Sequence, residues 1–266
     1  MRILLLLFIS LNSFSDVSFG ELENFVIESD YDTRKIQIYY PNNKIIDSDT
    51  LFIFMNDGEE LFNAAESWHN MEWGIDEKIE EMNLNERELN FVIIGIHSAK
   101  KGNRFFVDET KRYAEYFPKE SIPYFDSGFK KRRYQEWVNN NNLYYLEFLT
   151  EDVIPFVEDK FDISLSNKNL GIIGASMGGL SALNALIEYP DLFGFAGCIS
   201  THWVGIKISE YLILPFRMKI SGDESTTKAI QKYIKNNVSK LSSQKLYFDH
   251  GTVGLDSLYE LSLIHI

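Results

Sequence analysis

The sequence predicts an α/β domain in which a mostly parallel central sheet carries helices on both faces. Residues 51–55 and 91–96 are continuous apolar runs, which are typical of strands buried on both sides. Between them, residues 72–82 show the three-to-four spacing of apolar side chains that indicates a helix. Strand-like and helix-like segments alternate again between residues 143 and 200, and such alternation predicts parallel strand pairing.

The length and composition of the chain restrict its class. With 266 residues, of which 45% are hydrophobic, the chain can bury one substantial core, and disorder is excluded. The formal net charge of -13 argues against binding to nucleic acid, which needs a basic face, and against anionic membrane surfaces. Cys198 is the single cysteine, so an intramolecular disulfide is impossible, and its apolar neighbours predict a buried, inert thiol.

Residues 1–20 are predicted to be a secretory signal peptide. Arg2 precedes a short apolar run at residues 3–9, and the small residues Ser18 and Gly20 offer a cleavage site. The run is too short to span a bilayer. We therefore expect a secreted or periplasmic protein without stable membrane association after cleavage, with residues 21–266 as one domain. A lipid-free membrane anchor is the competing interpretation.

Local patterns predict the first elements of the domain. Residues 24–28 and 34–40 alternate apolar and polar side chains, which indicates two strands of a hairpin, and Pro41 should end the second. The segment at residues 97–142 is polar, aromatic and without clear periodicity. We predict a long irregular loop there, and loops of that length are usually functional.

One further feature lies within this segment, and another follows it directly. Its basic residues 130–133 are interpreted as a solvated face and not as a binding patch. Residues 143–160 predict a helix that Pro155 should kink or break, because proline lacks the N–H that a helix interior needs.

The motif that carries chemistry follows a strand-like run at residues 170–173. It reads Gly174-Ala175-Ser176-Met177-Gly178-Gly179 and leads into a helical pattern at residues 180–187. This is the G-x-S-x-G nucleophile elbow in its expected context of strand, sharp turn and helix. The turn lifts the serine hydroxyl clear of the sheet, and glycines are needed where a Cβ would collide with a neighbour. A plain glycine-rich turn is the competing interpretation.

The later elements follow from the same kind of pattern. The helix after Ser176 should end near residues 189–190, and strands are predicted at residues 194–200 and 245–249.

A serine nucleophile needs donors for the oxyanion that forms when it attacks a carbonyl group. We predict one donor in the backbone N–H of Met177, at the positive end of the following helix. The second should come from the loop after the central strand, where Gly58 and Glu59 lie. The Asp57-Gly58 pair is equally consistent with a plain turn.

The acid that orients the base should follow a later strand at its carboxyl end. Asp256 has that position, whereas Asp249 is still on the strand and Asp223 is also explained as a turn or helix cap.

The base is missing from its expected place. In this arrangement the chain order is serine, acid, histidine, and a crossover of roughly a dozen residues or more separates neighbouring parallel strands. His265 follows Asp256 too closely to satisfy that requirement. His202 and His97 each follow a strand at the active-site edge and are weak substitutes for the base. We assign His97, His202 and Trp203 to a possible pocket wall, and His69 and His250 carry no specific signal.

From about residue 25 to residue 260, the chain resembles the putative-esterase family of α/β-hydrolases, which includes enterochelin-esterase-like, feruloyl-esterase-like and esterase D-like proteins. The matching stretches are residues 56–62, 73–77, 112–118, 174–180, 200–203 and 251–259. The resemblance implies the α/β-hydrolase fold and a Ser-Asp-His triad in which Ser176 and Asp256 match the first two positions. It also supports the loop at residues 57–59 as part of the oxyanion hole.

The resemblance stops abruptly after Glu260. The family continues with a proline and a long helix, whereas this sequence runs Leu261-Ser262-Leu263-Ile264-His265-Ile266. We therefore expect a C-terminally truncated sequence in which the last helix, the last strand and the catalytic histidine are missing.

The residues together predict a secreted serine hydrolase of carboxylic esters that acts on a small-molecule or carbohydrate-linked ester. As it stands, this chain is expected to be a poor catalyst. No cofactor and no metal are expected. A non-catalytic carbohydrate- or partner-binding relative and an acyltransferase are the alternatives, and an acyltransferase would share the acyl-enzyme and differ in the acceptor.

Overall fold

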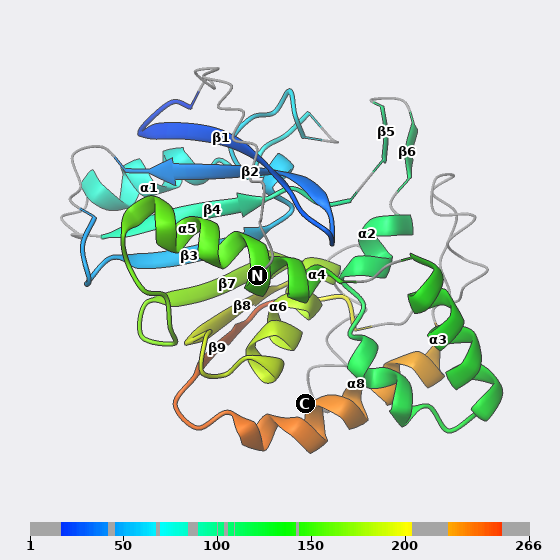
Figure 1. Ribbon diagram of the computed structural model, residues 1–266. Coiled ribbons are helices and arrows are strands. Elements are labelled where there is room, and N and C mark those ends of the chain that lie inside the picture. Colours follow the sequence, from blue (N-terminus) through cyan, green and yellow to red (C-terminus); the bar gives the residue numbers. More distant parts are fainter. Residues whose placement is uncertain are drawn as a thin grey trace. The chain divides into compact units, whose positions relative to one another are not determined.

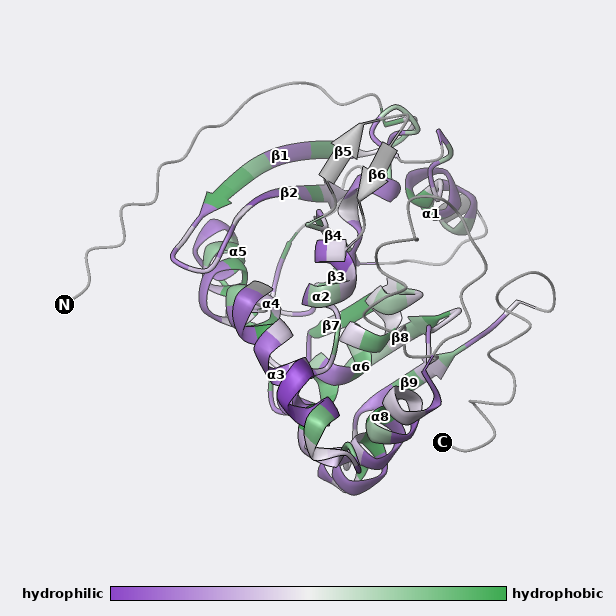
Figure 2. Cartoon of the chain, turned by 90° about the vertical axis from the view of Figure 1, so that its right-hand side faces the viewer, coloured by the Kyte–Doolittle hydropathy of each residue, from purple (hydrophilic) through white to green (hydrophobic). Residues whose placement is uncertain are grey.

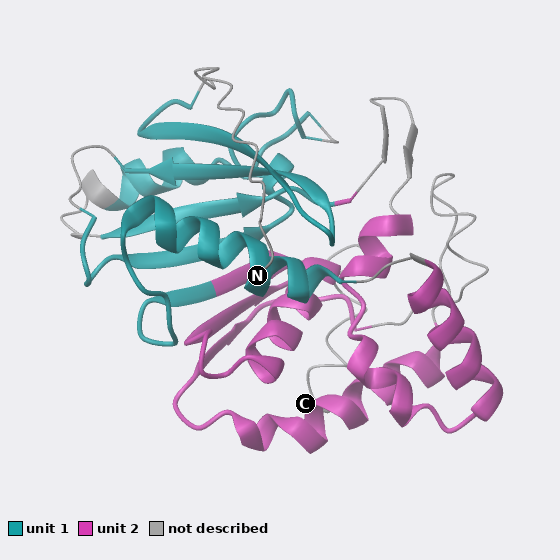
Figure 3. Cartoon of the chain, viewed as in Figure 1, with its two compact units in different colours: residues 1–98, 144–171 teal, residues 99–143, 172–266 magenta. Residues whose placement is uncertain are grey.

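The computed structural model describes residues 17–41, 46–67, 70–84, 90–99, 101–103, 106–108, 110–141, 144–203 and 223–251. Seven of the described strands follow the order β1-β2-β4-β3-β7-β8-β9 in one sheet, and β5 pairs with β6 in a second (Figure 1). The predicted α/β class with a mostly parallel sheet is confirmed. The chain divides into two compact units, unit 1 with residues 1–98 and 144–171 and unit 2 with residues 99–143 and 172–266 (Figure 3).

The strands of unit 1 agree with the sequence prediction. They are β1 (Glu21–Glu28), β2 (Thr33–Tyr40), β3 (Leu51–Asn56) and β4 (Phe91–Ile96). The predicted hairpin of β1 and β2 is confirmed, and β2 ends directly before Pro41. The two apolar runs form the parallel pair β3 and β4, and all residues of β4 are buried. β7 (Leu170–Ala175) begins beside β3, where Phe52 donates its N–H to the carbonyl of Asn169 at 2.7 Å.

The helical segments of unit 1 include one continuous run through Pro155, so the chain does not break there. They are η1 (Gly58–Glu60), α1 (Ile75–Leu84), α4 (Tyr145–Phe148), η3 (Leu149–Val153) and α5 (Ile154–Phe161). η3 is a π-helical turn, and Pro155 lies in the first turn of α5. The N–H of Ile154 donates to the carbonyl of Leu149, so the π-helical turn passes directly into α5.

Helices cover both faces of the unit 1 strands. α1 and α5 lie on opposite sides of these strands in both views (Figures 1 and 2). Phe156 of α5 packs edge-on against Phe25 with ring centroids 5.2 Å apart, and Phe161 contacts Phe52 at 5.4 Å. On α1, Ile79 is buried.

Unit 2 contains the remaining elements. They are β5 (Lys101–Asn103), β6 (Phe106–Asp108), α2 (Thr110–Glu115), η2 (Lys119–Tyr124), α3 (Gly128–Asn141), α6 (Met177–Glu188), β8 (Phe195–Ile199), α8 (Glu224–Asn237), η5 (Val238–Lys240) and β9 (Lys245–Phe248). β8 and β9 are parallel. α6 is buried from Met177 to Ile187, which makes it the central helix of this unit.

The prediction of an irregular loop at residues 97–142 is wrong, because most of this segment is helical. α3 is largely hydrophilic (Figure 2), so its sequence shows little of the apolar pattern that marks a helix. Tyr134 of α3 stacks on Phe125 with ring centroids 4.6 Å apart, and two polar contacts join the helix to a distant segment. The hydroxyl of Tyr134 bonds that of Thr226 at 2.8 Å, and Lys130 pairs with Asp223 at 2.8 Å. Arg132 and Arg133 of the basic cluster are exposed, as predicted.

α8 was not predicted as a helix, although its first turn carries a recognisable signal. Asp223 is the N-cap residue, and its carboxylate accepts the N–H of Ser225 at 3.0 Å. The interpretation of Asp223 as a helix cap is therefore confirmed.

The predicted character of Cys198 is also confirmed. The residue is fully buried in β8, and burial raises the pKa of its thiol to about 12. The thiolate, which is the reactive form, is therefore not populated near neutral pH. Within the part of the chain that the structure describes, no helix is long and apolar enough to cross a membrane.

Candidate active site

Ser176 lies at the junction between β7 and α6 in a strained backbone conformation. Its φ is 56° and its ψ is -122°, a region that residues other than glycine rarely occupy. The strand ends at Ala175 and the helix begins at Met177, so this one residue reverses the chain direction. This is the geometry of a nucleophile elbow, and it agrees with the predicted context of the motif.

Both backbone polar groups of Ser176 are bound, which holds the strained conformation in place. Its N–H donates to the carbonyl of Ile199 at 2.9 Å, at the end of β8. Its carbonyl accepts the N–H of His202 at 3.1 Å and that of Leu180 at 3.3 Å. Strain of this kind persists where the surroundings over-determine the conformation.

Gly179, the residue directly after the G-x-S-x-G motif, has no room for a side chain in the first turn of α6. A Cβ at this position would lie 2.6 Å from Oγ1 of Thr201 and 3.0 Å from the carbonyl oxygen of Gly174. The second atom belongs to the backbone and cannot move aside. Any larger residue would push α6 away from β7 and β8.

The side chain of Ser176 is available for chemistry. The residue is half-buried, and its hydroxyl does not cap α6. Directly after it comes the N–H of Met177, which has no intrahelical acceptor because it lies in the first turn. The helix dipole also favours negative charge at this end. The hydroxyl of Ser176 and the N–H of Met177 thus lie side by side at the start of α6, and their functions as nucleophile and oxyanion donor stay predictions.

The surroundings of the elbow in unit 2 are aromatic and cationic. Arg112 of α2 is buried and donates to the carbonyl of Ala175 at 3.5 Å. His202 is 8% exposed, and its ring meets that of Tyr113 edge-on at 6.0 Å. Trp203 is 1% exposed and packs against Phe248, so it lies in the interior of this unit. Sequence reasoning assigned no role to Arg112, whose contact with the elbow depends on tertiary structure.

Asp249 has a different function from the one a triad acid would have. Its carboxylate accepts the N–H of Ser200 at 2.9 Å. Ser200 has a positive φ of 41°, so Asp249 fixes a strained residue at the end of β8. The predicted acid, Asp256, lies outside the described residues, as do His69 and His265.

The predicted second oxyanion loop belongs to unit 1 and begins with a left-handed residue. Asp57 has a φ of 60°, and Gly58 then packs directly on β4. The N–H groups of Glu60 and Leu61 are bound by the carbonyls of Asp57 and Gly58 at 2.9 and 3.3 Å. The assignment of Gly58 and Glu59 as oxyanion donors stays a prediction.

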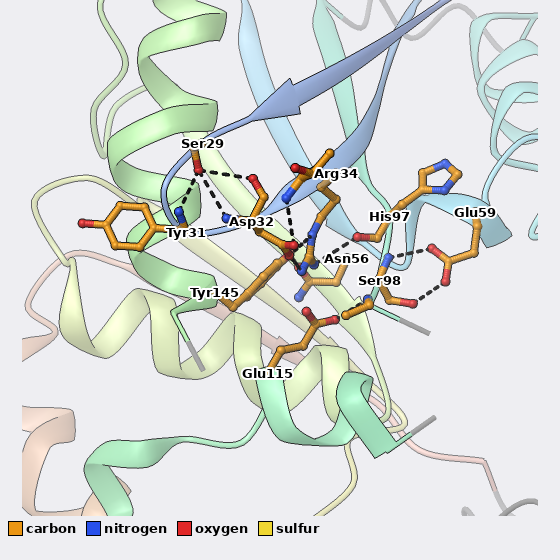
Figure 4. A network of polar contacts seen from close by, with 12 residues as sticks. Ser29, Tyr31, Asp32, Arg34, Asn56, Glu59, His97, Ser98, Glu115 and Tyr145 are labelled. Carbon is orange, nitrogen blue, oxygen red and sulfur yellow. Dashed lines mark hydrogen bonds and ion pairs between the residues drawn. The ribbon is translucent and has the colours of Figure 1, made fainter. Parts of the chain in front are cut away.

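His97 follows β4 in unit 1 and is held in a polar cluster. Arg34 donates to its carbonyl at 3.1 Å (Figure 4), and its Nε2 lies 3.7 Å from a carboxylate oxygen of Glu66. Burial lowers the pKa of His97 to about 4, although the charges of Glu59 and Glu66 oppose the shift. The imidazole is therefore neutral at pH 7. Among the described residues, no group of three or more His, Cys, Asp or Glu side chains could hold a metal ion.

Comparisons with known proteins identify the family. A family model described as "Putative esterase" matches residues 32–253. The uncharacterized protein YbbA of Bacillus subtilis (strain 168) is 26% identical over 172 residues, which are 64% of this chain and 58% of that protein. The chain thus spans less than two thirds of the length of this curated relative.

Solved structures share the fold. A ferulic acid esterase superposes with a TM-score of 0.57 at 15% identity, covering 92% of this chain and 84% of its own. The S-formylglutathione hydrolase from Agrobacterium tumefaciens gives 0.52 at 13% identity, with 96% and 86% covered. The enterobactin esterase FES from Shigella flexneri gives 0.53 at 14% identity, with 94% and 58% covered. At these identities the likeness concerns the fold alone.

With an elbow serine between β7 and α6, a mostly parallel sheet and a family model that spans most of its length, this chain belongs to the putative-esterase family.

Proposed function

We propose that this protein is a secreted serine hydrolase of carboxylic esters whose substrate is a small-molecule or carbohydrate-linked ester. The observation that carries the proposal is the strained backbone of Ser176, held at the start of α6 by bonds to Ile199 and His202. A protein that binds its ligand without chemistry has no need to hold a serine in this conformation. Membership in the esterase family supports the same reaction class.

The reaction follows from the groups around the elbow. Oγ of Ser176 attacks the ester carbonyl carbon while a histidine takes the hydroxyl proton. The carbonyl oxygen becomes an oxyanion, which the N–H of Met177 stabilises. The histidine returns the proton to the leaving alcohol, and an acyl-enzyme remains. Water, activated by the same histidine, then releases the acid and restores Ser176.

The triad that we propose consists of Ser176, Asp256 and a histidine that this sequence does not include. The crossover that joins neighbouring parallel strands needs more residues than separate Asp256 from His265. The substitute within the chain is His202, whose backbone N–H binds the carbonyl of Ser176 at 3.1 Å. The two possibilities make different predictions for the reactivity of Ser176.

Labelling with a fluorophosphonate distinguishes them, because this probe reacts with a serine that a base activates. We expect the protein expressed from its gene, with all downstream codons, to be labelled rapidly at Ser176. The chain of residues 21–266 should be labelled at least about a hundredfold more slowly, since general-base catalysis contributes roughly that much or more. Peptide mapping by mass spectrometry identifies the labelled serine.

Two results would count against these assignments. Rapid labelling at a serine other than Ser176 would refute the assignment of Ser176 as the nucleophile. Equal labelling rates for the short and the long chain would refute the proposal that the catalytic histidine is missing from this sequence. His202→Ala should then abolish the reaction.

Export is a separate prediction. The charged start and the leucine-rich run at residues 3–9 should direct secretion, with the mature chain beginning between Asp16 and Glu21, just before β1. Amino-terminal sequencing of the exported protein measures the cleavage point. Exported protein that still begins at Met1 would favour the membrane-anchor interpretation.

A further inference from the structure

Ser176 is held by a short segment of unit 2 that begins at the end of β8. The N–H of Ser176 donates to the carbonyl of Ile199 at 2.9 Å, and its carbonyl accepts the N–H of His202 at 3.1 Å. Both partners belong to residues 199–202, which we call the elbow clamp. Because the clamp binds the serine on both sides of its Cα, the direction in which Oγ of Ser176 points depends on the conformation of the clamp.

The elbow clamp itself contains a strained residue. Ser200 has a φ of 41°, a left-handed value that costs free energy in a residue other than glycine. Such a conformation persists only where the surrounding structure holds it. The clamp also packs closely against α6, since a Cβ at Gly179 would lie 2.6 Å from Oγ1 of Thr201 and 3.3 Å from the nitrogen of Ile199.

Asp249, the residue directly after β9, binds the chain on both sides of Ile199. Its carboxylate accepts the N–H of Ser200 at 2.9 Å, and its own N–H donates to the carbonyl of Cys198 at 3.4 Å. A hydrogen bond to a carboxylate is stronger than one between neutral groups. The contact with Asp249 can therefore offset the strain at Ser200.

One peptide group connects Asp249 to Ser176. The peptide between Ile199 and Ser200 donates its N–H to Asp249 and accepts the N–H of Ser176 with its carbonyl, each at 2.9 Å. A carboxylate on the N–H side polarises the peptide, which makes the carbonyl a stronger acceptor. Carboxylate, peptide and serine N–H thus form a chain of two hydrogen bonds that ends at the strained elbow.

We infer that Asp249 is a positioning residue that sets the backbone of Ser176 through the Ile199–Ser200 peptide. The inference rests on the proposed function and deepens it, because it assigns to an acidic residue a function that needs no contact with the substrate. A misplacement of about 1 Å can lower the rate of an enzyme about a hundredfold. Such a function requires a hydrogen-bond acceptor at residue 249 and uses the charge only to strengthen the bond.

The test compares three variants in the protein expressed from its gene, with p-nitrophenyl butyrate as substrate. Asp249→Ala removes the acceptor and should lower kcat about a hundredfold with little change in KM, because the nucleophile is displaced. Asp249→Asn should retain most of the activity, since its carbonyl oxygen can accept the N–H of Ser200. Asp249→Leu has nearly the shape of the asparagine variant without an acceptor, so its kcat should fall as far as that of Asp249→Ala.

Asp223→Ala is the matched control. Asp223 is also half-buried and also accepts a backbone N–H in unit 2, that of Ser225 at 3.0 Å, but it does so at the start of α8. Loss of this cap should lower Tm by about 2–4 °C and leave kcat unchanged. Should Asp249→Ala fail to fold, the comparison of Asp249→Leu with Asp249→Asn still decides the matter.

The possible outcomes separate this inference from the function on which it rests. If turnover depends on Ser176 but Asp249→Ala and Asp249→Leu keep the kcat of the unsubstituted protein, the positioning function is wrong and the hydrolase proposal stands. Equal losses in Asp249→Asn and Asp249→Ala would show that the charge is required, and they would overturn the positioning function in favour of a triad acid.

Two further results would also overturn the inference. A loss of kcat in Asp223→Ala as large as that in Asp249→Ala would show that both residues contribute to stability alone. Absence of Ser176-dependent turnover in the unsubstituted protein would overturn both the positioning function and the hydrolase proposal.

Discussion

Ser176→Ala is expected to abolish ester hydrolysis, with a decrease in kcat of about a million-fold, the loss typical of removing an essential triad member. Alanine keeps the Cβ of serine, so the strain at a φ of 56° is the same in both proteins. The bonds to Ile199 and His202 involve the backbone and are also kept. The substitution therefore removes Oγ and leaves the elbow intact. Release of p-nitrophenolate from short p-nitrophenyl esters measures the effect.

Ser181→Ala is the control for this experiment. Ser181 is a buried serine of the same helix, and alanine is a better helix former, so this variant should fold and keep its activity. Both variants should unfold near the Tm of the unsubstituted protein. If Ser176→Ala turned over ester as fast as the unsubstituted protein, the assignment of Ser176 as the nucleophile would be refuted.

Asp256→Asn is expected to lower kcat about ten-thousand-fold, because the amide holds the triad histidine in the wrong tautomer. Asp256 lies outside the described residues, so this prediction rests on its place after the last strand and on the family resemblance. The protein expressed from its gene is needed for the measurement, since it includes the proposed histidine.

Asp249→Asn provides the comparison for the acid. The carboxylate of Asp249 accepts the N–H of Ser200 at 2.9 Å, and asparagine can keep this bond through its carbonyl oxygen. We expect this variant to retain most of the activity. The reverse pattern, with Asp249→Asn inactive and Asp256→Asn active, would identify Asp249 as the triad acid.

Local sequence was sufficient where neighbouring residues decide the backbone conformation. The hairpin of β1 and β2 and the buried pair β3 and β4 follow from alternation and apolar runs. The elbow belongs to this group, since the strand, the glycines and the helix around Ser176 are contiguous. The sequence also predicted that Cys198 is buried.

The segment at residues 97–142 could not be predicted in this way. α3 has a weak apolar pattern, and its side chains make tertiary contacts. Tyr134 stacks on Phe125 and bonds Thr226, and Lys130 pairs with Asp223, about ninety positions further along the chain. α8 is different, because its buried residues are spaced three and four apart and Asp223 precedes them. That helix was recognisable from its sequence and was missed.

The sequence by itself determined the candidate nucleophile and its elbow, because both depend on the order of adjacent residues. Tertiary structure alone decided which distant side chains and backbone groups meet. Glu59 meets Ser98 across an interval of 39 positions, Asp249 meets Ser200 across 49, and Arg112 meets Ala175 across 63. No local pattern encodes such pairs, since a buried carboxylate or guanidinium finds its partner only when the folded chain brings distant backbone groups within hydrogen-bond distance.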